Sequence, residues 1–239
     1  MNRIIKAEIY KLFHNKTIIF TILASLVLGA MVYFLPDFYK GQDTLGLIAS
    51  TISDAMAFIA IVAGAAICTD IQDKTLKNIV LSGVSRTKIY IGRLIAVILM
   101  SSFVLTLAMI SRAVGATLLS GIESVTEAQV PLLLEAIGLQ FVIMIGVVSV
   151  VFLIASIIKN LSYSLMASLL LINGTPMLFP YLKSKFNLDL ASFDITSLMD
   201  SIGKLKINGD VIIHVAIITG VVVVITNFIG TMIFKRTDI

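Results

Sequence analysis

The residues able to carry out chemistry are few and scattered along this chain of 239 residues. His14 and His214, the two histidines, lie at opposite ends of the sequence, and Cys68 is the single cysteine. A metal site needs several ligands close together, and a zinc hydrolase motif such as H-E-x-x-H is missing. The G-x-S-x-G motif of serine hydrolases and the phosphate-binding G-x-x-x-x-G-K-[ST] loop are missing too. The sequence predicts neither catalysis nor ATP binding by these routes.

Two charged residues lie at some depth within apolar segments, Arg112 and Asp54. The long side chain of Arg112 can extend to the polar surface, or it can pair with a carboxylate of another segment, either Asp54 or Glu135. Ionisable groups inside membrane segments are by default functional candidates. We therefore treat Arg112 and Asp54 as candidate residues of a transport path or of its gate.

The composition predicts a membrane protein. Hydrophobic residues make up 58% of the chain and charged residues 13%, and the mean hydropathy is +1.04. Soluble domains ordinarily have about 45–50% apolar and about 25% charged residues. We expect an all-α integral membrane fold with one transmembrane domain, residues 1–239. Its net charge of +4 lies beside apolar segments, without a separate basic domain that could bind nucleic acid.

Six apolar segments are about as long as the roughly 20 residues that a helix needs to cross a bilayer. They are residues 17–35, 47–69, 94–119, 132–158, 161–182 and 211–234. Before them, residues 3–16 fit an amphipathic helix in the membrane interface, with a plain basic flank as the alternative. The apolar side of this helix consists of Ile5, Ile9, Leu12 and Phe13.

The positive charges predict the orientation. One side of the predicted membrane collects Arg3, Lys6, Lys11, Lys16, Lys74, Lys77, Arg86, Lys88, Arg93, Lys159, Lys235 and Arg236. The other side has Lys40, Lys183, Lys185, Lys204 and Lys206. Because cytoplasmic loops carry the excess of Lys and Arg, we expect both termini in the cytosol.

Two features are expected on the outer side. Residues 183–210 are too apolar for a solvated loop and predict one or two short helices in the outer interface. Asn173, Gly174 and Pro176 interrupt the fifth apolar segment, which predicts either a broken, re-entrant helix or a simple proline kink. Irregular backbone at membrane depth lines protein or a water-filled cavity, so these residues are further candidates for the gate or path.

The polar stretch 70–93, between the second and third segments, predicts a helix, a turn and a second helix on the inner surface. Asp73 can cap the first helix, Gly83 suits the left-handed position that ends it, and Ser85 can cap the next. An apolar side is formed by Leu76, Ile79 and Val80, at positions i, i+3 and i+4. A solvated basic loop would not need such a side.

This stretch resembles the coupling region of membrane permease subunits of type 2 ABC exporters, where an acidic residue and Thr-Leu precede a hydrophobic pair, a small residue and [VI]-S-R. The matching residues are Asp73, Thr75, Leu76, Ile79, Val80, Ser82, Gly83, Val84, Ser85, Arg86, Lys88, Ile89, Tyr90, Gly92 and Arg93. Lys74 replaces the usual Gly of the family, and Arg93 replaces the usual Lys. The amphipathic start, the six segments and the basic tail also fit, so the resemblance covers essentially the whole chain.

The resemblance implies that residues 70–93 form a cytosolic coupling segment that docks into a separate ABC ATPase. The implied docking residues are Asp73, Thr75, Leu76, Ile79, Val80, Ser82, Gly83, Val84, Ser85 and Arg86. ATP and Mg²⁺ would bind to the ATPase, with no cofactor in this chain. The working unit would contain a second permease, identical or different, in a bacterial plasma membrane. The short length resembles the branch that serves bacteriocin immunity, bacitracin resistance and peptide export, which implies an amphipathic or hydrophobic cargo such as a peptide, bacteriocin or drug.

Two other functions remain open at this point. A membrane sensor or assembly protein would bind a partner without transporting anything, and would need no ATPase. An ion-efflux permease would want carboxylates at mid-depth, and the sequence offers few. An intramembrane enzyme is disfavoured because the residues for its chemistry do not form a constellation.

Overall fold

A computed structural model describes residues 2–34, 44–72, 85–120, 129–186 and 194–236 of the chain. The regular elements within these ranges are all helices, as the sequence predicts. In chain order they are α1 (Asn2–His14), α2 (Lys16–Phe34), α3 (Thr44–Ala49), α4 (Thr51–Gln72), α6 (Arg86–Ser120), α7 (Val130–Ile158), α8 (Leu161–Phe186), α9 (Ile195–Gly203) and α10 (Gly209–Arg236).

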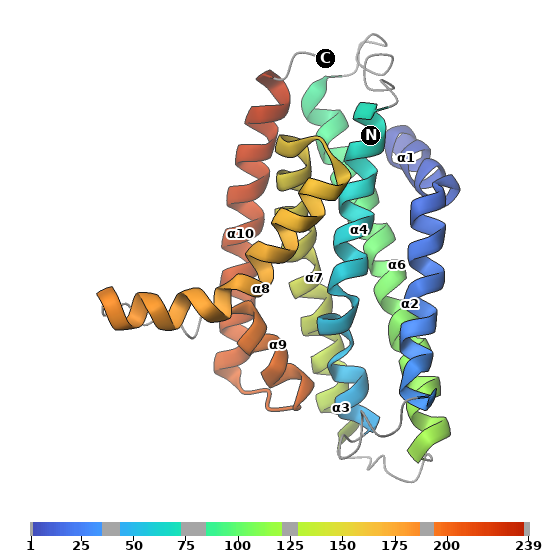
Figure 1. Ribbon diagram of the computed structural model, residues 1–239, viewed down its shortest axis with the longest axis vertical. Helices are drawn as coiled ribbons and strands as arrows, with labels where there is room; N and C mark the ends of the chain where they lie inside the picture. Colours follow the sequence, from blue (N-terminus) through green and yellow to red (C-terminus); the bar gives the residue numbers. More distant parts are fainter. Residues whose placement is uncertain (1, 35–43, 73–84, 121–128, 187–193, 237–239) are drawn as a thin grey trace.

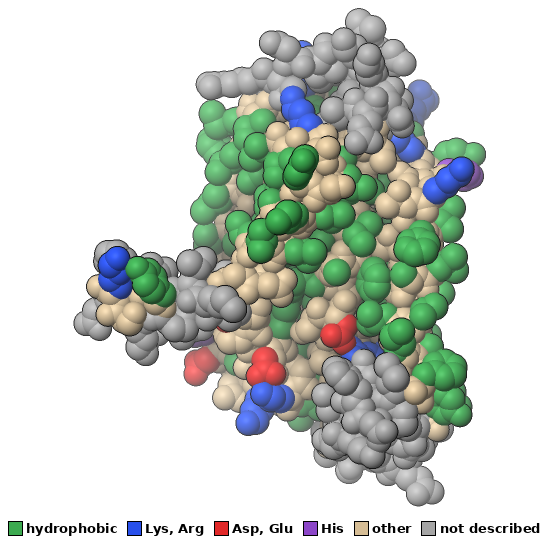
Figure 2. Space-filling model, viewed as in Figure 1, with side chains coloured by type: hydrophobic (Ala, Val, Ile, Leu, Met, Phe, Trp, Pro, Cys, Tyr) green, Lys and Arg blue, Asp and Glu red, His purple; other side chains and the backbone are tan. Residues whose placement is uncertain are grey.

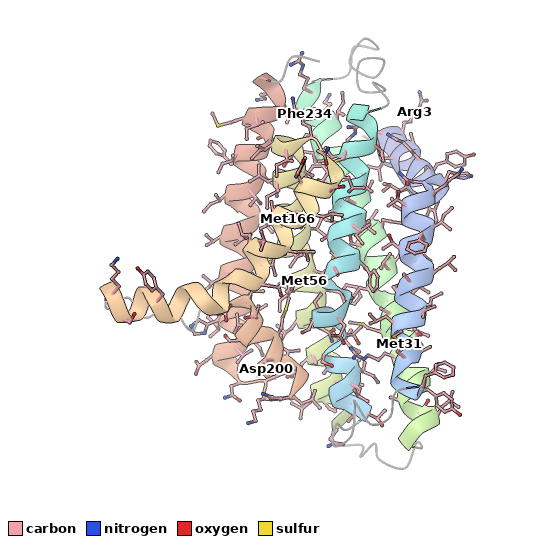
Figure 3. The ribbon with its side chains drawn as sticks, in the orientation of Figure 1. Arg3, Met31, Met56, Met166, Asp200 and Phe234 are labelled. Carbon is pink, nitrogen blue, oxygen red and sulfur yellow. The ribbon has the colours of Figure 1, made fainter. Side chains whose placement is uncertain are left out.

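The long helices α2, α4, α6, α7 and α10 run along the long axis of the molecule (Figure 1). Arg3 and Phe234 lie at one end of this bundle and Asp200 near the other (Figure 3). We call the first the terminal end and the second the opposite end. The hydrophobic core draws most of its buried residues from α4, α6 and α7. Apolar side chains also cover the visible flank of the bundle (Figure 2), as expected for a surface that faces lipid.

Four helical stretches are long and apolar enough to cross a membrane by themselves: Thr44–Thr69, Arg86–Leu118, Val130–Ile158 and Gly209–Lys235. The pair α1 and α2, which is bent by 68°, adds a fifth when counted as one span. The apolar part of α8, Leu161–Gly174, is a shorter helix. The described part of the chain therefore has a multi-pass membrane architecture with four or five candidate spans, and the sixth span stays a prediction.

The second predicted span, 47–69, is not one uninterrupted helix. It is divided at Ser50 into α3 and α4. The Ser50 hydroxyl donates to the Leu47 carbonyl (3.2 Å), and the Thr51 hydroxyl donates to the Ile48 carbonyl (2.7 Å). Short hydroxyl side chains that bond to nearby carbonyls compete with regular helix geometry. This local competition accounts for a break that the apolar pattern does not reveal.

Helix α8 is continuous through Asn173, Gly174 and Pro176, but its last turns leave the bundle sideways (Figure 1). Glycine and proline together are a usual cause of such a bend. Of the two sequence-based alternatives, the geometry matches a bent helix rather than a broken one. The carbonyl of Leu169 accepts a hydrogen bond from the Asn173 side-chain amide (2.9 Å), so this amide is satisfied within α8.

The predicted short helix of the segment 183–210 is α9. Its N-cap is Asp194, whose carboxylate accepts a hydrogen bond from the backbone N–H of Thr196 (3.2 Å). Its inward side buries Leu198, Met199 and Ile202 against the opposite end of the bundle. These three apolar residues explain why the segment reads as too apolar for a solvated loop.

Helices α2 and α6 approach most closely at Gly29. A Cβ atom at this position would lie 2.6 Å from the side chain of Ser111 and 2.9 Å from the backbone nitrogen of Arg112. The Ser111 hydroxyl crosses the contact and donates to the carbonyl of Leu26 (2.6 Å). Small residues that let helix backbones approach are a common basis of association in membranes. Gly29 therefore sets the distance between α2 and the end of α6 that carries Arg112.

We predict that Gly29→Ala lowers stability by about 1–3 kcal/mol, because the new methyl group overpacks the contact with α6. Gly138→Ala is the matched control, since nothing lies within 4 Å of a Cβ at Gly138, which is also in a helix. Unfolding in detergent can be followed with a thiol-reactive dye, because Cys68 is the single cysteine and is buried. Equal unfolding midpoints for the two variants would show that the α2–α6 distance is not tight at Gly29.

Candidate functional site

Most of the predicted docking residues lie outside the described part of the chain. They are Asp73, Thr75, Leu76, Ile79, Val80, Ser82, Gly83 and Val84. Ser85 and Arg86 are described. The carbonyl of Ser85 accepts a hydrogen bond from Ile89 N–H (3.2 Å), and α6 begins at the next residue, Arg86. Ser85 therefore occupies the capping position predicted for it.

The first turns of α6, which we call the α6 base (residues 86–93), contact α10 and α7 on one side. The Arg86 guanidinium donates to the backbone carbonyl of Lys235 in the last turn of α10 (2.9 Å). The buried ring of Tyr90 lies edge-on to Phe152 of α7 (centroids 5.1 Å apart) and against Phe234 of α10 (5.7 Å). Aromatic pairs at such distances are worth about 0.5–1.5 kcal/mol beyond their buried area.

The α6 base also contacts α1. A Cβ atom at Gly92 would meet the side chain of Ile4, which shows how closely the two helices approach. One turn along α1, the Glu8 carboxylate accepts a hydrogen bond from Nε of Arg93 at 3.0 Å. Both side chains are buried. The α6 base therefore joins three other helices, immediately after the segment that the sequence predicts to dock an ATPase.

A second ion pair lies toward the opposite end of α6. The Arg112 guanidinium contacts the Asp54 carboxylate of α4 at 2.5 Å. The Arg112 side chain is only 2% exposed, whereas that of Asp54 is 41% exposed. Arg112 therefore does not extend to the polar surface, which was one of the two sequence-based alternatives. It pairs with a carboxylate, and of the two candidates that partner is Asp54, while Glu135 is exposed on α7.

Gln140 of α7 joins the same end of the bundle and was missed by the sequence analysis. Its side-chain oxygen accepts a hydrogen bond from Ile52 N–H at the start of α4 (2.9 Å). Its side-chain amide donates to the Ile48 carbonyl at the end of α3 (3.4 Å). One side chain thus satisfies backbone groups on both sides of the break at Ser50. A glutamine in the middle of an otherwise apolar segment is the sequence signal that could have identified it.

The candidate path residues of the sequence analysis are therefore only partly brought together. Arg112 and Asp54 form one ion pair between α6 and α4, in which only Arg112 is buried. Asn173 and Gly174 lie on α8, where the Asn173 side chain is exposed and a Cβ at Gly174 would meet nothing within 4 Å. Among the described residues, no group of three His, Cys, Asp or Glu side chains is arranged to hold a metal ion.

We predict that Asp54→Asn destabilises the protein more than Arg112→Gln does. Removing one partner of a buried ion pair costs about 3–5 kcal/mol, because the remaining charge is left without its counter-ion. Asp54→Asn leaves the buried Arg112 charge without this carboxylate, whereas after Arg112→Gln water can reach the half-exposed Asp54. The unfolding midpoints of the two variants measure the difference.

The exposed pair Lys204–Asp200 provides the control, because its side chains are 60% and 64% exposed. Asp200→Asn should change stability by less than about 1 kcal/mol, the usual value of a surface ion pair. If Asp54→Asn lowered stability no more than Asp200→Asn does, the Arg112–Asp54 contact would stabilise the protein no more than a surface ion pair.

Comparison with known proteins and protein families identifies the family of this chain. A search of curated proteins found no match. The model of a family described as "ABC-2 family transporter protein" matches residues 4–174, from α1 into α8. The match covers the α6 base, the Glu8–Arg93 and Arg112–Asp54 pairs, and Gln140. Members of this family are multi-pass membrane proteins of transporters. The chain belongs to the ABC-2 family of transporter proteins.

Proposed function

We propose that the chain is the permease subunit of an ABC exporter, driven by a separate ATPase that docks on residues 73–86. Family membership supports a transport role, and we propose that ATP and Mg²⁺ bind to the partner ATPase. The observation that carries the proposal is the packing of the α6 base. Arg86 ends the docking segment, Tyr90 and Arg93 follow it, and together they contact α10, α7 and α1.

Helix α6 offers a direct route from the docking segment to the opposite end of the bundle. It has 35 residues and is therefore about 52 Å long, well beyond the roughly 30 Å of a bilayer core. Along this length it meets α1, α7 and α10 at its base and α2 and α4 near Ser111 and Arg112. A displacement at the base is thus transmitted to the helices that close the opposite end.

The proposed orientation has both termini and the docking segment in the cytosol of a bacterial cell. The end of α4, the base of α6 and the last turn of α10 all lie at the terminal end (Figure 1). The larger share of Lys and Arg belongs to segments at this end, and such an excess favours the cytoplasmic side. The partners in this arrangement are an ABC ATPase, a second permease copy and membrane lipid.

The proposed cargo is amphipathic or hydrophobic, such as a peptide, a bacteriocin or a drug. The support is the apolar interior of the described bundle. The ion pairs of α6 with its neighbours, Arg93–Glu8 and Arg112–Asp54, lie toward its two ends. An ion-efflux permease would need carboxylates at mid-depth to compensate a desolvated cation.

We predict that Leu76→Asp combined with Ile79→Asp removes the ATPase from the purified complex. Two carboxylates on the apolar side of the docking segment would be buried without partners in the groove of the ATPase. The tagged chain is purified from membranes of its native host, and chains with a phosphate-binding loop are quantified by mass spectrometry. Leu188→Asp with Leu190→Asp is the matched control, because residues 183–210 are expected on the outer side.

Membrane insertion of the docking variant is checked in the same preparations. An ATPase that is retained by the docking variant would overturn the docking assignment. A wild-type chain that purifies with other membrane proteins, but with no chain carrying a phosphate loop, would favour a sensor or assembly protein over a transporter.

We also predict the side of the membrane on which each end lies. In a Cys68→Ser background, Lys204→Cys should react with a membrane-impermeant maleimide in intact cells. Lys16→Cys and Lys159→Cys should react only after the cells are opened. All three side chains are exposed in the structure, so a lack of reaction reports the membrane and not burial. The reverse pattern of labelling would invert the proposed orientation.

A further inference from the structure

Helix α1 presents to α6 a side that overlaps only in part, at Leu12, with its predicted apolar side. Ile4, Glu8 and Leu12 follow one another at intervals of four residues and form one side of the helix. Ile4 contacts the position of Gly92, Glu8 binds Arg93, and Leu12 is buried. The protein-facing side of α1 therefore has a carboxylate at its centre.

The apolar side predicted from the sequence lies roughly 90° around the helix from this one, given about 100° per residue. Of its residues, Leu12 is buried and Ile9 packs against the core, whereas Phe13 is exposed and lies beside the Phe103 ring of α6 (centroids 5.6 Å apart). An apolar residue in place of Glu8 would attach α1 to α6 by packing alone. A carboxylate attaches it only where Arg93 is opposite, because an unpaired buried charge is strongly unfavourable.

A second cation lies within reach of Glu8. The Lys11 ammonium is 3.8 Å from the other carboxylate oxygen of Glu8, one turn along the same helix, and its side chain is 37% exposed. Glu8 thus has one positive partner across the helix interface and one that travels with it. When α6 moves away from α1, Lys11 still compensates the charge of Glu8. Opening the contact with Arg93 therefore does not leave the Glu8 carboxylate without a cation.

We propose that Glu8 is a positioning residue of the transport cycle, and that its contact with Arg93 opens and re-forms as the ATPase moves the α6 base. This inference rests on the proposed function. In the closed contact, α1 follows α6. In the open contact, α6 moves with α7 and α10 while α1 stays at the membrane surface. Helix α1 remains attached to α2 through the bend at Asn15. The Asn15 carbonyl accepts hydrogen bonds from the N–H groups of Ile18 and Ile19 (both 3.0 Å).

The approach of Ile4 to Gly92 provides a direct test. The Cβ atom of Ile4 lies 3.5 Å from an ideal Cβ at Gly92, which is within the range that a disulfide requires. In a Cys68→Ser background, Ile4→Cys with Gly92→Cys should form a disulfide on oxidation and hold α1 closed on the α6 base. The complex with its ATPase is reconstituted in liposomes, and ATP hydrolysis is measured before oxidation, after oxidation and after reduction.

We expect the oxidised pair to hydrolyse ATP at less than a tenth of its own reduced rate, with recovery on reduction. The single variants Ile4→Cys and Gly92→Cys, treated identically, should show no dependence on oxidation. Because each protein is compared with itself, a general loss of stability cannot mimic this result. Disulfide yield should also fall when the ATPase is trapped with vanadate, since the contact is then open.

Glu8→Gln separates positioning from simple stabilisation. It should leave the amount of bound ATPase unchanged, because the docking segment is intact, and lower hydrolysis per assembled complex at least fivefold. Exchange of the charges, Glu8→Arg with Arg93→Glu, should recover part of this loss. An oxidised disulfide pair that is as active as the reduced one would overturn this inference alone, whereas a wild-type complex without any ATPase would overturn the proposed function and this inference with it.

Discussion

The structure depends on a simple electrostatic constraint, that a charge removed from water must meet its opposite. Helix α6 has two buried arginines, Arg93 and Arg112, about 28 Å apart along its axis. Each meets a carboxylate from a different helix, Glu8 of α1 or Asp54 of α4. Apolar helices in lipid can slide or rotate against one another with little change in buried apolar surface. The two ion pairs restrict that freedom, since Arg93 and Arg112 each face a carboxylate of a particular neighbouring helix.

The same constraint acts on backbone groups at the opposite end of the bundle. A helix break at membrane depth exposes N–H and C=O groups that lipid cannot satisfy. Gln140 supplies both a donor and an acceptor at the break between α3 and α4, and the small residues Gly46 and Gly203 let α9 pack closely beside it. At this end, α3 and the start of α4 are therefore held by the polar contacts of Gln140, and α9 is held by its apolar side.

The sequence predicts where the helices lie in the chain well, but it predicts poorly which helices pack against one another, for a physical reason. Length and hydropathy identify the apolar helices, and the capping residue Ser85 identifies the start of α6. However, lipid and protein interior are equally apolar, so hydropathy does not tell a buried helix from a lipid-facing one. Within Val130–Ile158, 56% of an 18-residue apolar stretch is buried, whereas within Gly209–Lys235 the buried share of such a stretch is only 17%.

The partners of the charged residues that join the helices are hard to predict from the sequence. Arg112 could be narrowed to two partners because it was conspicuous in an apolar span. Glu8 was not conspicuous, since a carboxylate in a basic amphipathic helix looks like part of its solvated side. Its role depends on Arg93, which is 85 residues away in sequence, and local periodicity contains no information about that pairing. The docking segment itself lies outside the described residues, so its predicted helices stay predictions.

The α6 base combines two kinds of contact that respond differently to force. Tyr90 packs its ring among Phe152, Phe234 and the backbone at Gly230, where a side chain would clash with the phenol oxygen. Close packing of this kind resists displacement of α6 relative to α7 and α10. Glu8 has a second arrangement, because Lys11 can replace Arg93 as its nearest cation. In the proposed cycle, movement of the docking segment would therefore leave the contacts of Tyr90 with α7 and α10 in place. The contact between Glu8 and Arg93 would open.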